Sequence, residues 1–285
     1  MAAELHVHLE GSVAPAAVGL GHVKMGDFAG FLQLFKAISE RLETPEDYAG
    51  VTTGLLRRFL DEGIDTAEIT LSAGVVLWKK QDLHKTYEAI RSACNAYPEA
   101  RVKWCFDAVR QFGVEPAMRV AEIAAELRNE GVVSFGIGGD EVRGPAALFE
   151  SVYAFARSKG LRLTAHAGET AGPESVWDAL RIGAERIGHG IRAVEDPALL
   201  RHLRDHNVPL EVCITSNLAT GVVKRIEDHP VRRLFDAGVP ITLNTDDPGI
   251  FETSLAREFE IARDVFGFSE SELKTIADNA YRYAF

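Results

Sequence analysis

Eight short apolar runs, separated by longer amphipathic segments, constrain the fold of this 285-residue chain more than any other feature. Runs rich in Val, Ile, Leu and Phe that alternate with helical patterns are typical of repeated βα units around a parallel sheet. The predicted strands are residues 4–9, 67–71, 102–109, 133–137, 162–167, 185–188, 210–214 and 241–244. Eight units predict a (β/α)8 TIM barrel of the α/β class, with residues 1–285 as a single catalytic domain.

The segments between these runs carry recognisable helix starts. Thr44 precedes a Pro-Glu pair, Asp82 precedes another periodic segment, and Ser269 with Glu272 forms a capping-box pattern. The Gly-rich stretch 19–30 is weakly periodic where the helix after the first strand is expected. An open doubly wound sheet would show the same alternation, so the choice between the two folds depends on where the polar residues fall.

Composition and charge exclude several classes of partner. Hydrophobic residues make up 46% of the chain, enough for a large core, and the formal net charge is -11. No long Lys/Arg block is present, so nucleic acid and anionic membranes are poor partners. No apolar run approaches the length of a membrane span, and the first residues show no signal pattern, so we expect a cytoplasmic protein. The oligomeric state stays open.

The first strand carries a histidine pair. His6 and His8 are two residues apart in ELHVHLEGS, so the two-residue period of a strand places both on the barrel interior. Buried imidazoles are costly unless satisfied, and zinc would satisfy them, although two hydrogen-bonded core histidines explain the pair equally well. Cys94, Cys105 and Cys213 contain no CxxC pair, which argues against a thiolate zinc site.

Polar and titratable residues crowd the ends of the later strands. GIGGDE, TAHAGE, RIGHG, CITSN and NTDDP follow or end the fourth to eighth predicted strands. Catalytic groups of (β/α)8 barrels collect at that edge, which favours the barrel over the open sheet. His166 in TAHAGE and Asp246 in NTDDP complete a set of three histidines and one aspartate, suited to zinc with a position left for water.

Three further residues are placed for proton transfer. Glu169 follows the histidine of TAHAGE by three residues and is a candidate proton donor; the alternative is a surface carboxylate that caps the next helix. His189 lies between two glycines and is a candidate to orient or deprotonate water, or else a structural loop histidine. Asp247 adjoins Asp246, and we expect one carboxylate on the metal and the other on water or substrate.

The GIGGDE turn does not fit a phosphate site. Its spacing is not GxGxxG, and the two acidic residues at its end would repel phosphate. Gly139 is instead predicted to bring the backbone close to a substrate. Trp78 follows the second strand and is a candidate pocket residue, and Lys79 with Lys80 is either a carboxylate-binding pair or a solvated one.

Taken in order, these motifs resemble those of the adenosine deaminase family of metal-dependent amidohydrolases, over residues 4–251. The resemblance implies one zinc ion per chain, with the ligands His6, His8, His166 and Asp246. It also implies that Glu169 protonates the purine ring nitrogen beside the reacting carbon and that His189 and Asp247 act on the water. His8, Gly139 and Asp247 would face the substrate. Lysine is absent from the end of the fourth strand, where binuclear relatives carry one, which favours a single metal.

The implied reaction is hydrolytic deamination of a 6-aminopurine nucleoside, either adenosine or a larger relative such as 6-amino-6-deoxyfutalosine of menaquinone biosynthesis. An amidohydrolase acting on another C–N bond, such as that of adenine base or a cyclic amide, is the alternative enzyme, and a non-catalytic binding barrel is the third interpretation. Residues 12–31 are fewer than this family usually has over the ribose side, which bears on substrate choice. The HxE and PCxxC pattern of the base-editing zinc deaminases is absent.

Overall fold

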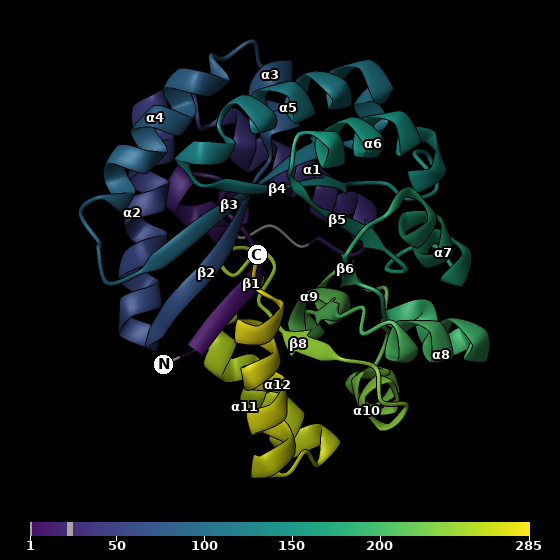
Figure 1. Ribbon diagram of the computed structural model, residues 1–285. Coiled ribbons are helices and arrows are strands. Elements are labelled where there is room, and N and C mark those ends of the chain that lie inside the picture. The colour runs from purple at the N-terminus through teal and green to yellow at the C-terminus, as the bar shows by residue number, and fades with distance from the viewer. Residues whose placement is uncertain (1, 22–24) are drawn as a thin grey trace.

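A computed structural model describes residues 2–21 and 25–285 and shows eight parallel strands arranged around a central axis, with helices outside them (Figure 1). The strands pair in chain order from β1 to β8. They are β1 Ala2–His8, β2 Ile64–Leu71, β3 Arg101–Val109, β4 Val132–Gly138, β5 Arg162–Ala167, β6 Arg186–His189, β7 Leu210–Val212 and β8 Ile241–Leu243. This order is that of a (β/α)8 barrel, as the sequence predicts.

The segment after β8 closes the barrel against β1. Val7 forms a parallel bridge with Asp246, the amide of His8 donates to the Asp246 carbonyl at 2.8 Å, and the Asp246 amide donates to the His6 carbonyl at 3.0 Å. The first and last strands of an open doubly wound sheet do not meet in this way, so that alternative is wrong.

Helices connect successive strands on the outside of the barrel (Figure 1). They are α1 Phe28–Glu40, α2 Pro45–Glu62, α3 Ala73–Trp78, α4 Leu83–Cys94, α5 Val114–Glu126, α6 Glu150–Ser158, α7 Pro173–Ile182, α8 Pro197–Asp205, α9 Ile214–Ala219, α10 Val231–Asp236, α11 Leu255–Phe266 and α12 Glu270–Tyr283. The predicted starts at Thr44, Asp82 and Ser269 are confirmed, because each side chain accepts a hydrogen bond from the first turn of its helix. Among the described residues, no helix has the length and apolar character needed to cross a membrane.

Most predicted strands differ from the observed ones only at their ends. β2 begins at Ile64, three residues before the predicted start. The prediction missed these residues because the first half of the strand carries polar side chains that interrupt the apolar pattern. The run predicted to end at residue 214 stops at Val212, because the amide of Ile214 donates to the Glu258 carboxylate at 2.9 Å and the chain turns into α9.

Helix α1 lies outside the main core. Phe31, Leu34 and Ile38 of this helix pack with Ile250 and Phe251 in a second hydrophobic cluster. In the weakly periodic stretch 19–30, Gly19 ends a short 3-10 turn at φ 76°, Asp27 caps α1, and residues 22–24 lie outside the described part. The helix after β1 is therefore present, but it begins at residue 28 and rests on the segment that follows β8.

Candidate active site

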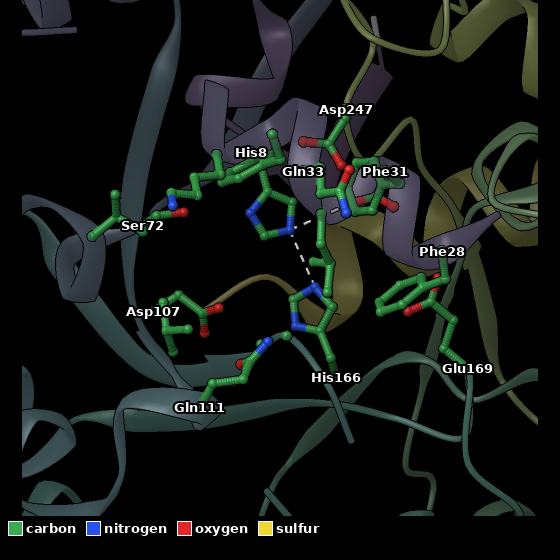
Figure 2. A pocket seen from close by; sticks show the side chains of 18 of the residues that line it. His8, Phe28, Phe31, Gln33, Ser72, Asp107, Gln111, His166, Glu169 and Asp247 are labelled. Carbon is green, nitrogen blue, oxygen red and sulfur yellow. Dashed lines mark hydrogen bonds and ion pairs between the residues drawn. The ribbon is translucent and has the colours of Figure 1, made fainter. Parts of the chain in front are cut away.

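A cavity of about 360 Å³ opens at the C-terminal ends of the strands (Figure 2). Its inner wall includes His8, His166, Glu169, His189, Asp246 and Asp247, and α1 covers it with Phe28, Phe31, Leu32, Gln33, Phe35 and Lys36. All of these α1 residues except Gln33 follow the three-to-four-residue spacing of one helix face. The predicted site residues other than His6 thus line a single cavity between the barrel mouth and α1.

The histidines and Asp246 converge at the inner end of this cavity. Ligand atoms of His6, His166, His189 and Asp246 all lie within 4.8 Å of one another. His8 joins them, since its Nε2 atom is 3.1 Å from Nε2 of His166 (Figure 2) and 3.4 Å from Oδ1 of Asp246. His6 Nε2 is also 3.4 Å from that oxygen. The structure therefore brings together the four predicted ligands and places His189 equally close.

Two of these residues have an uncommon backbone conformation. His189 and Asp246 have φ angles of 61° and 65°, in the left-handed region that non-glycine residues rarely adopt. Such conformations persist where surrounding contacts enforce them. For Asp246, these are the hydrogen bonds to β1 and the hydroxyl of Ser216, which donates to Oδ2 at 2.6 Å. This backbone conformation directs both side chains toward the histidine–aspartate cluster.

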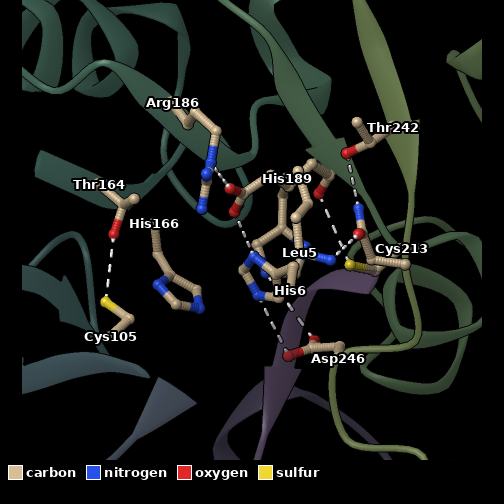
Figure 3. A network of polar contacts seen from close by, with 12 residues as sticks. Leu5, His6, Cys105, Thr164, His166, Arg186, His189, Cys213, Thr242 and Asp246 are labelled. Carbon is tan, nitrogen blue, oxygen red and sulfur yellow. Dashed lines mark hydrogen bonds and ion pairs between the residues drawn. The ribbon is translucent and has the colours of Figure 1, made fainter. Parts of the chain in front are cut away.

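A buried network holds His6 from behind (Figure 3). Nδ1 of His6 donates to Oε2 of Glu211 at 2.7 Å, and Arg186 donates to the other oxygen of Glu211 and to Glu68, both at 2.6 Å. A carboxylate on the far nitrogen of a ligand histidine fixes its tautomer and orientation. Sequence reasoning missed Glu211, although a carboxylate inside the apolar seventh strand was the available signal.

A second chain of hydrogen bonds fixes His189. The amide of Val231 donates to Nδ1 of His229, so the proton of neutral His229 lies on Nε2, which donates to Oδ1 of Asn217. The amide nitrogen of Asn217 then donates to Nδ1 of His189 at 3.2 Å. Neutral His189 therefore carries its proton on Nε2, which lies 3.8 Å from Glu169 Oε2 and from Asp246 Oδ2.

The electrostatics of the cluster suit a bound cation. Burial lowers the pKa of His8 to about 4 and that of His166 well below its usual range, so both imidazoles are neutral with free lone pairs. Burial opposes the charged form of Asp246, but the neighbouring imidazoles of His6, His189 and His8 hold its pKa well below normal. His6 Nε2 and His8 Nδ1 have no hydrogen-bond partner. A buried imidazole nitrogen without a partner, beside an ionised carboxylate, fits metal ligation.

Glu169 is buried and faces the cavity, 5% exposed, rather than lying on the surface. Its loop is held by Glu141, whose carboxylate accepts hydrogen bonds from the amides of Gly168, Glu169 and Thr170 at 2.7 to 2.9 Å. Burial, followed by the charges of Asp246 and Glu141, raises the pKa of Glu169 well above its usual range. This environment therefore favours the protonated form of the Glu169 carboxyl group.

Close backbone approaches surround Asp247. A Cβ atom placed on Gly11 would lie 1.6 Å from Oδ1 of Asp247, so only glycine fits at that position.

Gly139 has a φ of 98° and lines the cavity with its backbone, and an added Cβ would meet Gln111 at 2.3 Å. Trp78 lines the cavity as well.

The sequence left two interpretations of the Lys79–Lys80 pair, a carboxylate-binding pair and a solvated pair, and neither describes Lys79. The ammonium of Lys79 donates to the backbone carbonyls of Ser39 and Leu42, and this binds α3 to the end of α1. Lys79 is therefore a structural residue, neither solvated nor directed at a substrate.

Comparison with known proteins agrees with this geometry. A family model described as Adenosine deaminase matches residues 19–285. The chain belongs to the adenosine deaminase family. It is 37% identical over 307 residues to the aminodeoxyfutalosine deaminase of Streptomyces avermitilis, across 99% of this chain and 86% of that protein. It is 39% identical over 306 residues to the adenine deaminase of Rhizobium leguminosarum bv. trifolii, across 99% of this chain and 94% of that protein.

The fold of this adenosine deaminase family member matches solved relatives. The crystal structure of adenine deaminase from Arthrobacter aurescens aligns with a TM-score of 0.91 and 28% identity, covering 100% of this chain and 93% of that chain. Family membership makes the protein a hydrolytic deaminase of purine-like substrates, and the resemblance drawn from the strand-end motifs is confirmed.

Proposed function

We propose that this protein is a zinc-dependent deaminase of a 6-aminopurine nucleoside and that residues 1–285 act as one catalytic domain. The main observation in support of this function is the single cavity, which joins the histidine–aspartate cluster at its inner end to an aromatic wall at its outer end. Its volume of about 360 Å³ lies within the range of sites for small-molecule ligands. The relatives named for adenine and for aminodeoxyfutalosine support the purine.

His6, His8, His166 and Asp246 are the residues that we assign to the metal. Three imidazoles and one carboxylate form a donor set that zinc prefers, and Glu211 supports His6 from the far side. When bound there, zinc supplies Lewis acidity and lowers the pKa of water towards neutrality. The metal content of His8→Ala and His189→Asn would separate this assignment from one in which His189 replaces His8.

The proton donor is Glu169. Its raised pKa favours the protonated carboxyl group, and its place on the cavity wall allows it to protonate the purine ring nitrogen next to carbon 6. Water adds to carbon 6 while His189 holds it through the proton on Nε2. One proton of the water passes to the neighbouring groups and then to the departing amino nitrogen, which leaves as ammonia. The proton of the hydroxyl group left on carbon 6 returns to the Glu169 carboxylate, which gives the 6-oxopurine and restores the proton donor.

Gly139 and Asp247 are assigned to the purine. The left-handed backbone at Gly139 lets main-chain atoms face the ligand without a side chain between them. Oδ1 of Asp247 is buried without a hydrogen-bond partner, and burial together with Asp246 raises the pKa of this carboxyl. A polar atom of this kind beside the cavity suits a hydrogen bond to a purine nitrogen and to the attacking water.

The test is ultraviolet absorbance of the zinc-loaded enzyme with adenosine, 2′-deoxyadenosine, adenine and 6-amino-6-deoxyfutalosine, with Glu169→Gln as the inactive control. Loss of the aminopurine band in the wild type supports the function. Preference for 6-amino-6-deoxyfutalosine would place the enzyme in menaquinone biosynthesis, and preference for adenine would favour the second candidate, a base deaminase, which the 39% identical relative supports. No turnover of any of the four would refute the purine assignment.

A further inference from the structure

A pair of histidines lies on the outside of the barrel, away from the cavity. His202 is on α8, and His206 is the residue that caps the C-terminal end of this helix. Residues four apart on a helix share one face, and two histidines at this spacing can hold one zinc ion between them. Neither residue lines the cavity, and none of the roles assigned above uses them.

The two imidazole rings are already close together. They stack with their centroids 4.0 Å apart and an angle of 25° between the ring planes. The amide of His206 donates to the His202 carbonyl at 3.0 Å, so the helical hydrogen-bond pattern continues through the pair. A tetrahedral zinc ion with Zn–N bonds of about 2.0–2.1 Å separates two ligand nitrogens by about 3.3 Å. Small rotations of the two side chains therefore bring a nitrogen of each ring onto one ion.

The tautomer of His206 suits a metal ligand. Its Nδ1 atom lies 3.0 Å from the His202 carbonyl oxygen. A carbonyl oxygen only accepts, so Nδ1 carries the proton and the lone pair of the neutral ring lies on Nε2. A hydrogen bond from Nδ1 to a backbone carbonyl orients many ligand histidines in this way. His206 is exposed, so a cation reaches this nitrogen directly from solvent.

His202 packs against Trp177 of the neighbouring helix α7 (Figure 1). The ring centroids of these two residues lie 5.0 Å apart. The indole nitrogen of Trp177 donates to the carboxylate of Asp196 at 2.9 Å, which fixes the position of the indole. Burial, followed by the neighbouring His206, lowers the pKa of His202, and this favours the neutral imidazole that a metal requires.

The charges around the pair leave room for a cation. Asp205, the acidic residue beside His206 in the chain, pairs with Arg204 at 2.8 Å. The exposed His84 of α4, in contrast, pairs with Glu126 at 2.9 Å. Two adjacent imidazoles repel each other when both are charged. The stack therefore favours two neutral rings, and their lone pairs are available to a metal ion.

We propose that His202 and His206 form a surface site for a borderline divalent cation, Zn²⁺ or Cu²⁺, separate from the metal of the cavity. The two imidazoles supply two ligands, and water completes the coordination. Imidazole sites bind Cu²⁺ more strongly than Zn²⁺, as the general order of divalent metal affinities requires. An ion at this site holds the last turn of α8 together, and protein in excess zinc carries more than one ion per chain.

The test is a Cu²⁺ titration of zinc-loaded protein at pH 7.5, followed by tryptophan fluorescence. Cu²⁺ at the pair is expected to quench Trp177, because the indole contacts the His202 ring. His202→Ala and His206→Ala are each expected to weaken binding about a hundredfold, since the second imidazole binds the ion within the same molecule. His84→Ala removes an exposed histidine outside the pair and should keep the wild-type affinity.

A second measurement counts the ions directly. In titration calorimetry with Zn²⁺, zinc-loaded wild type should bind one further ion that the double variant His202→Ala/His206→Ala does not bind. Cu²⁺ quenching of the same strength in the wild type and in both single variants would overturn the site. Equal Zn²⁺ binding by the wild type and the double variant would overturn it too. Neither measurement uses catalysis, so the site and the proposed function stand or fall separately.

Discussion

Replacing Arg186 with methionine tests whether the buried network behind His6 stabilises the fold. Arg186 is 2% exposed and donates to Glu68, Glu211 and the carbonyl of Tyr283 at 2.6 to 2.8 Å. Its loss leaves two carboxylates buried without a cation. Removing one partner of a buried pair costs about 3–5 kcal/mol, and because Arg186 serves two carboxylates we expect the upper end, about 5 kcal/mol. That is a large share of the ~5–15 kcal/mol stability of a typical protein.

The assay is urea unfolding at pH 7.5, followed by circular dichroism, on metal-free protein so that ligand binding does not mask the loss. Arg192→Met is the matched control, because Arg192 pairs with Glu195 on the surface and its loss should change the free energy of unfolding by less than about 0.5 kcal/mol. In a Glu68→Gln background, Arg186→Met should cost about 1–3 kcal/mol less. If Arg186→Met costs no more than Arg192→Met, the network contributes nothing to stability.

Three other perturbations probe the site and its surroundings. His6→Ala should lower zinc retention at least tenfold after dialysis against chelator, measured by metal analysis, and wild-type retention would remove His6 from the ligand set. Gly11→Ala should reduce kcat/KM by about a hundredfold with little loss of secondary structure, because the new methyl group displaces Asp247; normal kinetics would contradict that contact. Hydrogen bonds from Arg232 lower the pKa of Glu272 from 4.5 to about 2, so this pair stabilises the fold above pH 4.5 and loses its effect as pH falls towards 2. Arg232→Met should therefore lower the urea midpoint at pH 7, and the deficit should shrink below pH 4.5 and nearly vanish only towards pH 2; a deficit that does not depend on pH would exclude the ion pair as its cause.

The strand-end motifs made the site predictable before its geometry was known. In a barrel of parallel strands the C-terminal ends meet at one edge, so polar residues at successive ends have to converge. His166, His189 and Asp246 follow from that rule alone. The reasoning needs only the order of strands, which apolar patterning supplies, and tolerates errors of a few residues at each strand end.

Contacts between segments that are distant in the chain could not be predicted from the sequence. Arg186 and Glu68 lie 118 residues apart, and no local pattern pairs them. The sequence left Lys79 open to interpretation as a ligand contact or a solvated residue. Its partners are backbone carbonyls, which every residue carries, so no sequence pattern identifies them. Lys36 was not singled out, since its place at the cavity depends on where α1 docks.

The docking of α1 connects substrate cover to the catalytic groups. The segment that follows β8 carries Asp246 and Asp247, and three residues further on it supplies Ile250 and Phe251 to the cluster that holds α1. The rings of Phe31 and Phe251 lie 5.3 Å apart. Because the amides of Ile250 and Phe251 both donate to the carbonyl of Asp247, the turn that aims this carboxylate also sets the platform on which α1 rests. One short segment therefore positions both the catalytic carboxylates at the inner end and the helix that forms the outer wall of the cavity.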